Sequence, residues 1–170
     1  MSFEYKHILP QDFNEDARVW IYQADRPLSD NEIADIQGQL NEFVSTWKSH
    51  GVPVKGYAGI FFSQFIVLMA DEAATGVSGC SIDSSVHMLQ QIGRQFGIDM
   101  FNWQLLAFMV NDKVEIIPRQ QINQALENNF ITPETLFFNN VVTSRKELEN
   151  RWLIPVSESW LRTKIKATVS

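Results

Sequence analysis

The sequence contains little of what covalent or metal-based stabilisation requires. Among its 170 residues are one cysteine, Cys80, and three histidines. A single cysteine cannot form a disulfide within the chain, and a four-cysteine zinc site is excluded. No spacing typical of zinc or calcium ligands occurs either, although Asp71, Glu72, Asp83 and His87 could meet. We therefore predict no metal and no cofactor, and we expect the reducing cytoplasm as the location.

Long apolar runs and an excess of basic residues are also missing. No segment reaches the roughly 18 consecutive apolar residues of a membrane-spanning helix, and the first residues do not resemble a secretory signal. Acidic residues outnumber basic ones by 20 to 14, which gives a formal net charge of −6. Such a chain is poorly suited to general binding of phosphate backbones. We expect neither a membrane nor a nucleic-acid partner.

The glycine-rich motifs that bind nucleotide phosphates do not occur. Neither GxxxxGK[ST] nor GxGxxG is present, and Gly76 and Gly79 are followed by Cys80 and Ser81 without a lysine. The lysine of the first motif is the group that reaches the phosphates. We therefore expect that the protein is not an ATPase of the P-loop type.

The composition itself is that of a folded domain. Hydrophobic residues make up 45% of the chain, aromatic residues 12% and charged residues 20%. A disordered chain would contain fewer apolar residues and carry more net charge. We predict a single domain over residues 1–170, with a core over residues 15–117 and an extension over residues 118–170.

The first part of the chain contains a strand and a well-marked helix. The first fifteen or so residues are of mixed polarity, and we expect them to be loosely held. Arg18–Gln23 is rich in β-branched and aromatic residues, which favours a strand. Ser29 and Glu32 have the spacing of a capping box at the start of a helix, and we place its end at His50 and Gly51.

The middle of the chain alternates strands with a second helix. We predict two strands joined as a hairpin, a helix closed by a glycine, a third strand, a two-residue turn and a short edge strand. The hairpin strands are Val54–Phe62 and Gln64–Asp71, and the helix after them ends at Gly97. The third strand is Trp103–Val110, the turn is Asn111 with Asp112, and the edge strand is Lys113–Ile117.

This order predicts an α+β fold. Strand, helix, strand, strand, helix and strand is the ferredoxin-like βαββαβ arrangement with an antiparallel sheet. The strand Lys113–Ile117 would add to its edge, and a mostly helical C-terminal extension would cover the sheet. Cover is needed because the strands FIVLMA and WQLLAFMV are apolar on both sides. Either the tail supplies it, anchored by Trp152, Leu153, Ile154 and Trp160, or a second subunit does, as in a homodimer.

One stretch, Thr75–His87, combines glycines with several hydroxyl side chains before a helix. Unpaired N–H groups at a helix start attract anions, and glycines allow a phosphate or carboxylate to approach closely. The primary hypothesis is therefore binding of a small anionic ligand at this loop and helix start. Its ligand-binding residues would be Ser78, Gly79, Ser81 and Ser84.

Two other interpretations of the chain stay open. In the first, Cys80 is a nucleophile activated by His87, with Asp83 four residues before it as the orienting carboxylate of a thiol enzyme. A purely structural reading of the same stretch makes Ser81 or Asp83 a helix cap and the cysteine a small buried apolar residue. In the second, the protein is an interaction or dimerisation module without catalysis.

Several strings of the sequence together resemble one protein family: RVWIYQ, WKSHG, FIVLMADE, SGCSIDSSVH, FNNVV and ESW. The family comprises uncharacterised bacterial proteins, some of which carry an automatic label of ABC-transporter ATPase. The resemblance runs from about Arg18 to Trp160, and SGCSIDSSVH is its most distinctive string. It implies a cytoplasmic bacterial protein. The label implies a phosphate-binding loop, and the family supplies no catalytic residue.

Overall fold

The chain forms two compact units, each built from two separate stretches. The computed structural model describes residues 5–71 and 79–169, without the side chains of residues 79–81 and 166–169. The first unit comprises Ser2–Phe101 and Val141–Glu149, and the second comprises Asn102–Asn140 and Asn150–Ser170. The expected boundary at residue 117 differs from this grouping, because residues 102–117 belong with most of the tail. That the units form a single domain stays a prediction.

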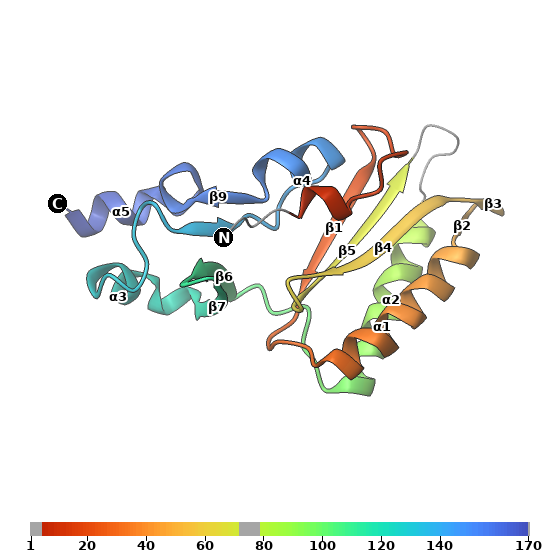
Figure 1. Ribbon diagram of the computed structural model, residues 1–170, viewed down its shortest axis with the longest axis horizontal. Helices are drawn as coiled ribbons and strands as arrows, with labels where there is room; N and C mark the ends of the chain where they lie inside the picture. Colours follow the sequence, from red (N-terminus) through yellow and green to blue (C-terminus); the bar gives the residue numbers. More distant parts are fainter. Residues whose placement is uncertain (1–4, 72–78, 170) are drawn as a thin grey trace. The chain divides into compact units, whose positions relative to one another are not determined.

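The first unit contains a three-stranded antiparallel sheet in the order β1-β5-β4. Its elements are η1 (Lys6–Ile8), β1 (Arg18–Gln23), α1 (Asp30–Thr46), β2 (Lys48–Ser49), β3 (Val52–Pro53), β4 (Lys55–Phe61), β5 (Phe65–Asp71), α2 (Gly79–Phe96) and most of α4 (Arg145–Arg151). Figure 1 shows α1 and α2 on one side of this sheet and η1 on the other.

Helix α1 begins as predicted and ends earlier than predicted. The Ser29 hydroxyl accepts a hydrogen bond from the Glu32 N–H, and the Glu32 carboxylate accepts one from the Ser29 N–H, which confirms the capping box. The helix stops at Thr46. His50 and Gly51, at φ 50° and 78°, form the turn between β2 and β3 instead of ending the helix.

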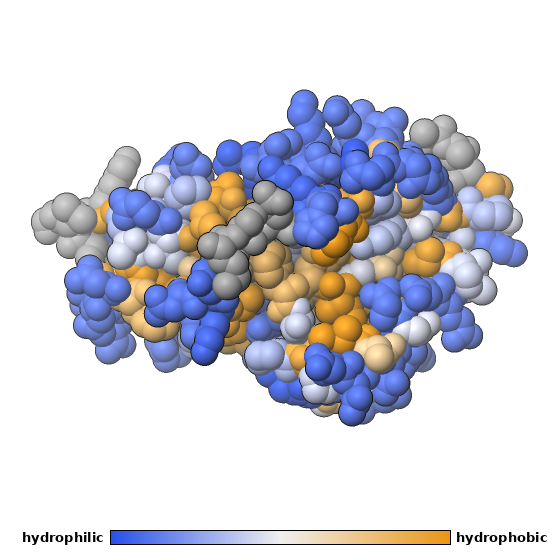
Figure 2. Space-filling view, viewed as in Figure 1, coloured by the Kyte–Doolittle hydropathy of each residue, from blue (hydrophilic) through white to orange (hydrophobic). Residues whose placement is uncertain are grey.

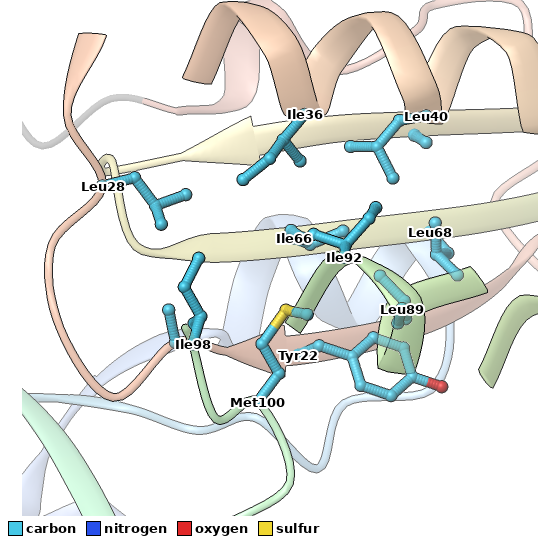
Figure 3. Packing of buried hydrophobic residues seen from close by; sticks show 12 residues of the cluster. Tyr22, Leu28, Ile36, Leu40, Ile66, Leu68, Leu89, Ile92, Ile98 and Met100 are labelled. Carbon is cyan, nitrogen blue, oxygen red and sulfur yellow. The ribbon is translucent and has the colours of Figure 1, made fainter. Parts of the chain in front are cut away.

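The helices bury one apolar face of the sheet. Ile36 and Leu40 on α1, and Leu89 and Ile92 on α2, are fully buried in one cluster with residues of β5. Figure 3 shows Ile36 and Leu40 pointing from α1 toward the strands. Gly97, at φ 65°, follows α2 directly, as predicted. This side of the sheet therefore forms the main core of the first unit.

The opposite face of the sheet is covered by the N-terminal segment, contrary to the expectation that this segment is loosely held. All seven residues of β5 are buried, so both faces of this strand are covered, as predicted. Tyr5, Leu9, Phe13 and Ala17 are between 1% and 9% exposed. These apolar residues lie against the sheet, whereas the residues between them are exposed, apart from the half-buried Pro10.

Specific contacts hold this N-terminal layer in place. The Phe13 ring lies edge-on to Tyr57 with centroids 6.5 Å apart, and the backbone N–H of Asn14 donates to the Asp71 carboxylate at 2.9 Å. The Tyr5 hydroxyl donates a hydrogen bond to the backbone carbonyl of Leu148. Leu148 is a fully buried residue. Part of the tail therefore helps to cover the sheet. The predicted anchors Trp152, Leu153, Ile154 and Trp160 belong to the second unit.

The ferredoxin-like topology is wrong in its last strand. The order β1-β5-β4 is that of a split βαβ unit, but Leu105–Val110 lies in a different sheet. A returning segment occupies the outer edge of β1 in its place. The Val19 N–H donates to the Thr143 carbonyl at 3.0 Å, and Arg18 forms a bridge with Ser144. Because this edge is taken, it cannot pair with the fourth strand of the predicted sheet.

The second unit contains a four-stranded antiparallel sheet in the order β7-β6-β8-β9. Its elements are β6 (Leu105–Val110), β7 (Lys113–Pro118), η2 (Arg119–Gln121), α3 (Ile122–Glu127), β8 (Leu136–Phe138), β9 (Leu153–Pro155), η3 (Val156–Glu158) and α5 (Arg162–Val169). One cluster of buried side chains joins the sheet to α3 and the tail: Phe108, Ile117, Ile122, Ala125, Leu126, Ile131, Phe137, Val156 and Leu161.

The fold class is α+β, as predicted, because both units combine helices with antiparallel sheets. Within the two described stretches, no helix has the length and apolarity to cross a membrane.

Candidate functional site

The stretch predicted to bind an anion falls largely outside the described residues. Ser78 lies outside them, as do the side chains of Cys80 and Ser81. Helix α2 begins at Gly79, so the predicted helix start is present. Binding of a small anion at this loop, and a role for Cys80 as a nucleophile, stay predictions.

The described part of the predicted site lies on the exposed side of α2. Asp83, Ser84 and His87 are exposed, whereas Leu89 is fully buried, as the helical spacing predicts. No hydrogen bond or ion pair joins Asp83 to His87. Over the described residues, no three His, Cys, Asp or Glu side chains group closely enough to hold a metal ion. Since the Cys80 side chain lies outside the described residues, the trio Cys80, His87 and Asp83 stays a prediction.

A groove of about 650 Å³ in the second unit offers a different candidate site. Its lining comes from the edge strand β7, the end of η2, and α3 with the turn that follows: Glu115, Ile116, Ile117, Gln121, Gln124, Ala125, Asn128, Asn129 and Phe130. In Figure 2, an apolar surface bordered by hydrophilic side chains lies where Figure 1 labels α3. The groove therefore runs between the edge of a sheet and a helix.

The turn between β6 and β7 determines which groups of β7 face this groove. Asn111 and Asp112 have φ of 51° and 64°, which is the left-handed conformation of a two-residue hairpin turn. The flanking residues Val110 and Lys113 are register partners and form the hydrogen-bonded pair that closes such a turn. Hydrogen-bonded pairs then recur at every second residue along the hairpin.

The outer edge of β7 consequently carries backbone groups without a strand partner. Glu115 and Ile117 direct their N–H and C=O groups toward β6, whereas Val114 and Ile116 direct theirs outward. No described strand pairs with this outer edge, because β7 is the first strand in the order β7-β6-β8-β9. Pro118, which has no N–H, ends the strand.

The side chains around the groove are mainly uncharged. The amides of Gln121, Gln124, Asn128 and Asn129 are exposed, and they make no hydrogen bond with any described residue. Glu115 is the one charged side chain in the lining, and it is half-buried. It forms no ion pair within the described parts of the chain. The groove thus combines free backbone edges, free amides and a single carboxylate.

Apolar side chains form the floor and one wall of the groove. Ile117 is 6% exposed and belongs to the core of the second unit together with Ala125. Phe130, also in the lining, is 47% exposed and presents apolar surface to an occupant. An occupant could therefore bury apolar surface here while its backbone pairs with the strand.

A second hollow, of about 370 Å³, lies beside α2 in the first unit. Its lining includes Arg94, Asp99 and Phe101. The backbone of Asp99 is already paired with Asp25, and its carboxylate accepts the Phe101 N–H at 2.9 Å. The polar groups of Asp99 are therefore satisfied within the fold.

Part of the groove could have been predicted. The sequence indicates Asn111 and Asp112 as a turn and Lys113–Ile117 as an edge strand, and both features are confirmed. The helix that forms the other wall carries a weaker signal, Pro118 at the start of a short helical piece. Its six residues, Ile122–Glu127, show neither a side-chain cap nor a long apolar stripe.

Comparison with models of protein families, with curated proteins and with solved structures found no match to this chain. The family resemblance therefore stays a prediction.

Proposed function

We propose that the protein is an interaction module that binds an extended segment of another protein by strand addition to β7. The observation that supports this most directly is the outer edge of β7: the N–H and C=O groups of Val114 and Ile116 point away from β6, and Ile116 lines the groove. In strand addition, main-chain hydrogen bonds supply affinity, and pockets for alternate side chains supply specificity.

The edge has the form that strand addition requires. Val114 and Ile116 each present one outward donor and one outward acceptor, so an added strand could form a ladder of four hydrogen bonds. Native proteins usually cover such an edge or shorten it, since it otherwise pairs with other chains. Here the neighbouring element leaves a groove of about 650 Å³ beside the edge, which gives an added strand room.

The four amide side chains suit recognition of a backbone. Each Gln or Asn amide offers both donors and an acceptor, so it can bond either the N–H or the C=O of a peptide group. Gln124 and Asn128 lie one helical turn apart on the α3 side of the groove. An extended segment between them and β7 would have polar partners on both of its sides.

Selection from a library of random heptapeptides displayed on phage tests the proposal. We expect the wild-type protein to enrich extended peptides. The Ile116→Pro variant should bind these peptides with an affinity lower by at least about tenfold. Proline at this position removes an outward N–H and no hydrogen bond to β6, so the hairpin is retained. Ile116→Val keeps the N–H and serves as the matched control.

Amide hydrogen exchange supplies an independent measurement. The N–H groups of Val114 and Ile116 should exchange fast in the free protein, whereas those of Glu115 and Ile117 should be protected. A selected peptide should slow exchange at Val114 and Ile116. Equal protection along all of β7 in the free protein, or equal peptide binding by Ile116→Pro and Ile116→Val, would rule out strand addition at this edge.

A further inference from the structure

We infer that the segment bound at β7 carries a lysine or arginine that pairs with Glu115, and an apolar residue two positions before it that packs beside Ile117. This inference rests on the proposed function and names the chemistry of the partner. It follows from the register of β7, from the side chains on its α3 face and from the charge of the groove.

The register determines which side chains of an added strand enter the groove. Glu115 and Ile117 are two residues apart, so their side chains lie on the same face of β7. Ile117 belongs to the same buried cluster as Ala125 of α3, which identifies that face as the one α3 covers. Residues of an added strand opposite Glu115 and Ile117 therefore direct their side chains into the groove.

The backbone pattern also brings these side chains close together. Val114 and Ile116 would form the hydrogen-bonded positions with an added antiparallel strand, so Glu115 and Ile117 fall at the non-hydrogen-bonded positions. Side chains opposite each other approach most closely at such positions. The residue opposite Glu115 thus lies within reach of its carboxylate.

Charge decides the residue type at the position opposite Glu115. Glu115 is the one charged residue in the lining, it is half-buried, and within the described chain it has no ion-pair partner. Opposite charges directly across two strands stabilise the pair, and like charges destabilise it. The whole chain carries a formal charge of −6, which also favours a cationic partner.

Apolar surface decides the position opposite Ile117. Ile117 and Ala125 form the floor of the groove, and Phe130 is a wall that is 47% exposed. An apolar side chain placed there would cover part of this surface. The sheet of this unit is antiparallel throughout, and antiparallel pairing is the more stable kind. In that direction the apolar residue precedes the cationic one in the bound segment.

The heptapeptides selected on the wild-type protein test this inference through a charge exchange. We expect an apolar residue followed two positions later by lysine or arginine. Fluorescence anisotropy should show binding of such a peptide to Glu115→Lys weakened about tenfold or more. A peptide in which the cation is replaced by glutamate should bind Glu115→Lys more tightly than it binds the wild type. A misfolded variant could not produce this reversal.

Glu127→Lys is the matched control. Glu127 is an exposed acid on α3 that does not line the groove, so the same change of net charge there should alter affinity by less than about twofold. Equal effects of the two variants would overturn the pairing with Glu115.

The outcomes separate this inference from the proposed function. Peptides that need the Ile116 N–H but show no cation opposite Glu115 would overturn the inference and leave strand addition in place. No enrichment on the wild type over Ile116→Pro would overturn both. A dimer in sedimentation velocity that Ile116→Pro abolishes would identify a second copy of this chain as the occupant and overturn the inference.

Discussion

The N-terminal layer of the first unit can be tested at two neighbouring apolar residues. Leu9 is 2% exposed and Ile8 is 48% exposed, although both side chains contain four carbon atoms. Truncation to alanine at Leu9 removes buried methyl groups and leaves a cavity against the sheet. Such changes in buried positions cost about 2–5 kcal/mol, and we expect about 2–4 kcal/mol because a peripheral segment can partly relax.

The same truncation at Ile8 should have a much smaller effect. About half of this side chain is already in water, so Ile8→Ala should cost less than about 1 kcal/mol. Urea unfolding followed by circular dichroism would compare the two variants with the wild type. With a slope of roughly 1–3 kcal/mol per molar urea, Leu9→Ala should lower the midpoint by about 0.7 M or more.

Amide hydrogen exchange would show which part of the fold the Leu9→Ala substitution destabilises. Amides of β5, on which the N-terminal layer lies, should lose protection in Leu9→Ala, while Ile8→Ala should leave them nearly unchanged. Equal midpoints for the two variants, or unchanged protection in β5, would refute the conclusion that this segment covers the sheet. The polar character of the first residues would then be the better guide to their structure.

Two further predictions concern α2 and α1. A Cβ at Gly93 would lie 2.7 Å from the backbone carbonyl oxygen of Ile98, so Gly93→Ala should destabilise the protein. A Cβ at Gly38 would have no neighbouring atom within 4 Å, so Gly38→Ala should stabilise the protein by about 0.5–1 kcal/mol. Thermal unfolding of both variants measures the difference. Hydrogen bonds from Arg26, at 2.7 and 2.9 Å, lower the pKa of Glu32 from 4.5 to about 2. The carboxylate therefore stabilises the fold above pH 4.5, and this contribution is lost as the pH falls toward 2. The stability difference between wild type and Glu32→Gln should shrink over that range; a constant difference would contradict the assignment.

Prediction succeeded where the cause of a structure is local. The Ser29 and Glu32 capping box, the turn at Asn111 and Asp112 and the glycine after α2 all involve residues within four positions of each other. Each depends on hydrogen bonds or backbone angles that neighbouring residue types dictate. These features are confirmed, and so is the order of the predicted helices and strands up to β7, although the structure adds the short strands β2 and β3 after α1.

Prediction failed where two distant segments compete for the same place. The strand Leu105–Val110 is apolar enough to pair with β1, as a ferredoxin-like fold requires. Thr143 and Ser144 occupy that edge instead, and the strand pairs with β7 and β8. Nothing in the composition of a strand states which sheet it joins, because each sheet offers the same backbone groups.

In the candidate site, too, the local features could be predicted from the sequence and the tertiary arrangement could not. From the sequence alone, the scarcity of cysteine, of long apolar runs and of nucleotide motifs limited the kinds of site to expect. The turn at Asn111 and Asp112 already indicated the edge strand that follows it. Only the tertiary structure places α3 beside that edge and leaves Glu115, in the groove between them, without an ion-pair partner among the described residues. Hydrogen bonds between neighbours determine a turn or a cap, whereas the place of α3 beside β7 depends on the packing of both elements against distant residues of the same core, such as Phe137, Val156 and Leu161.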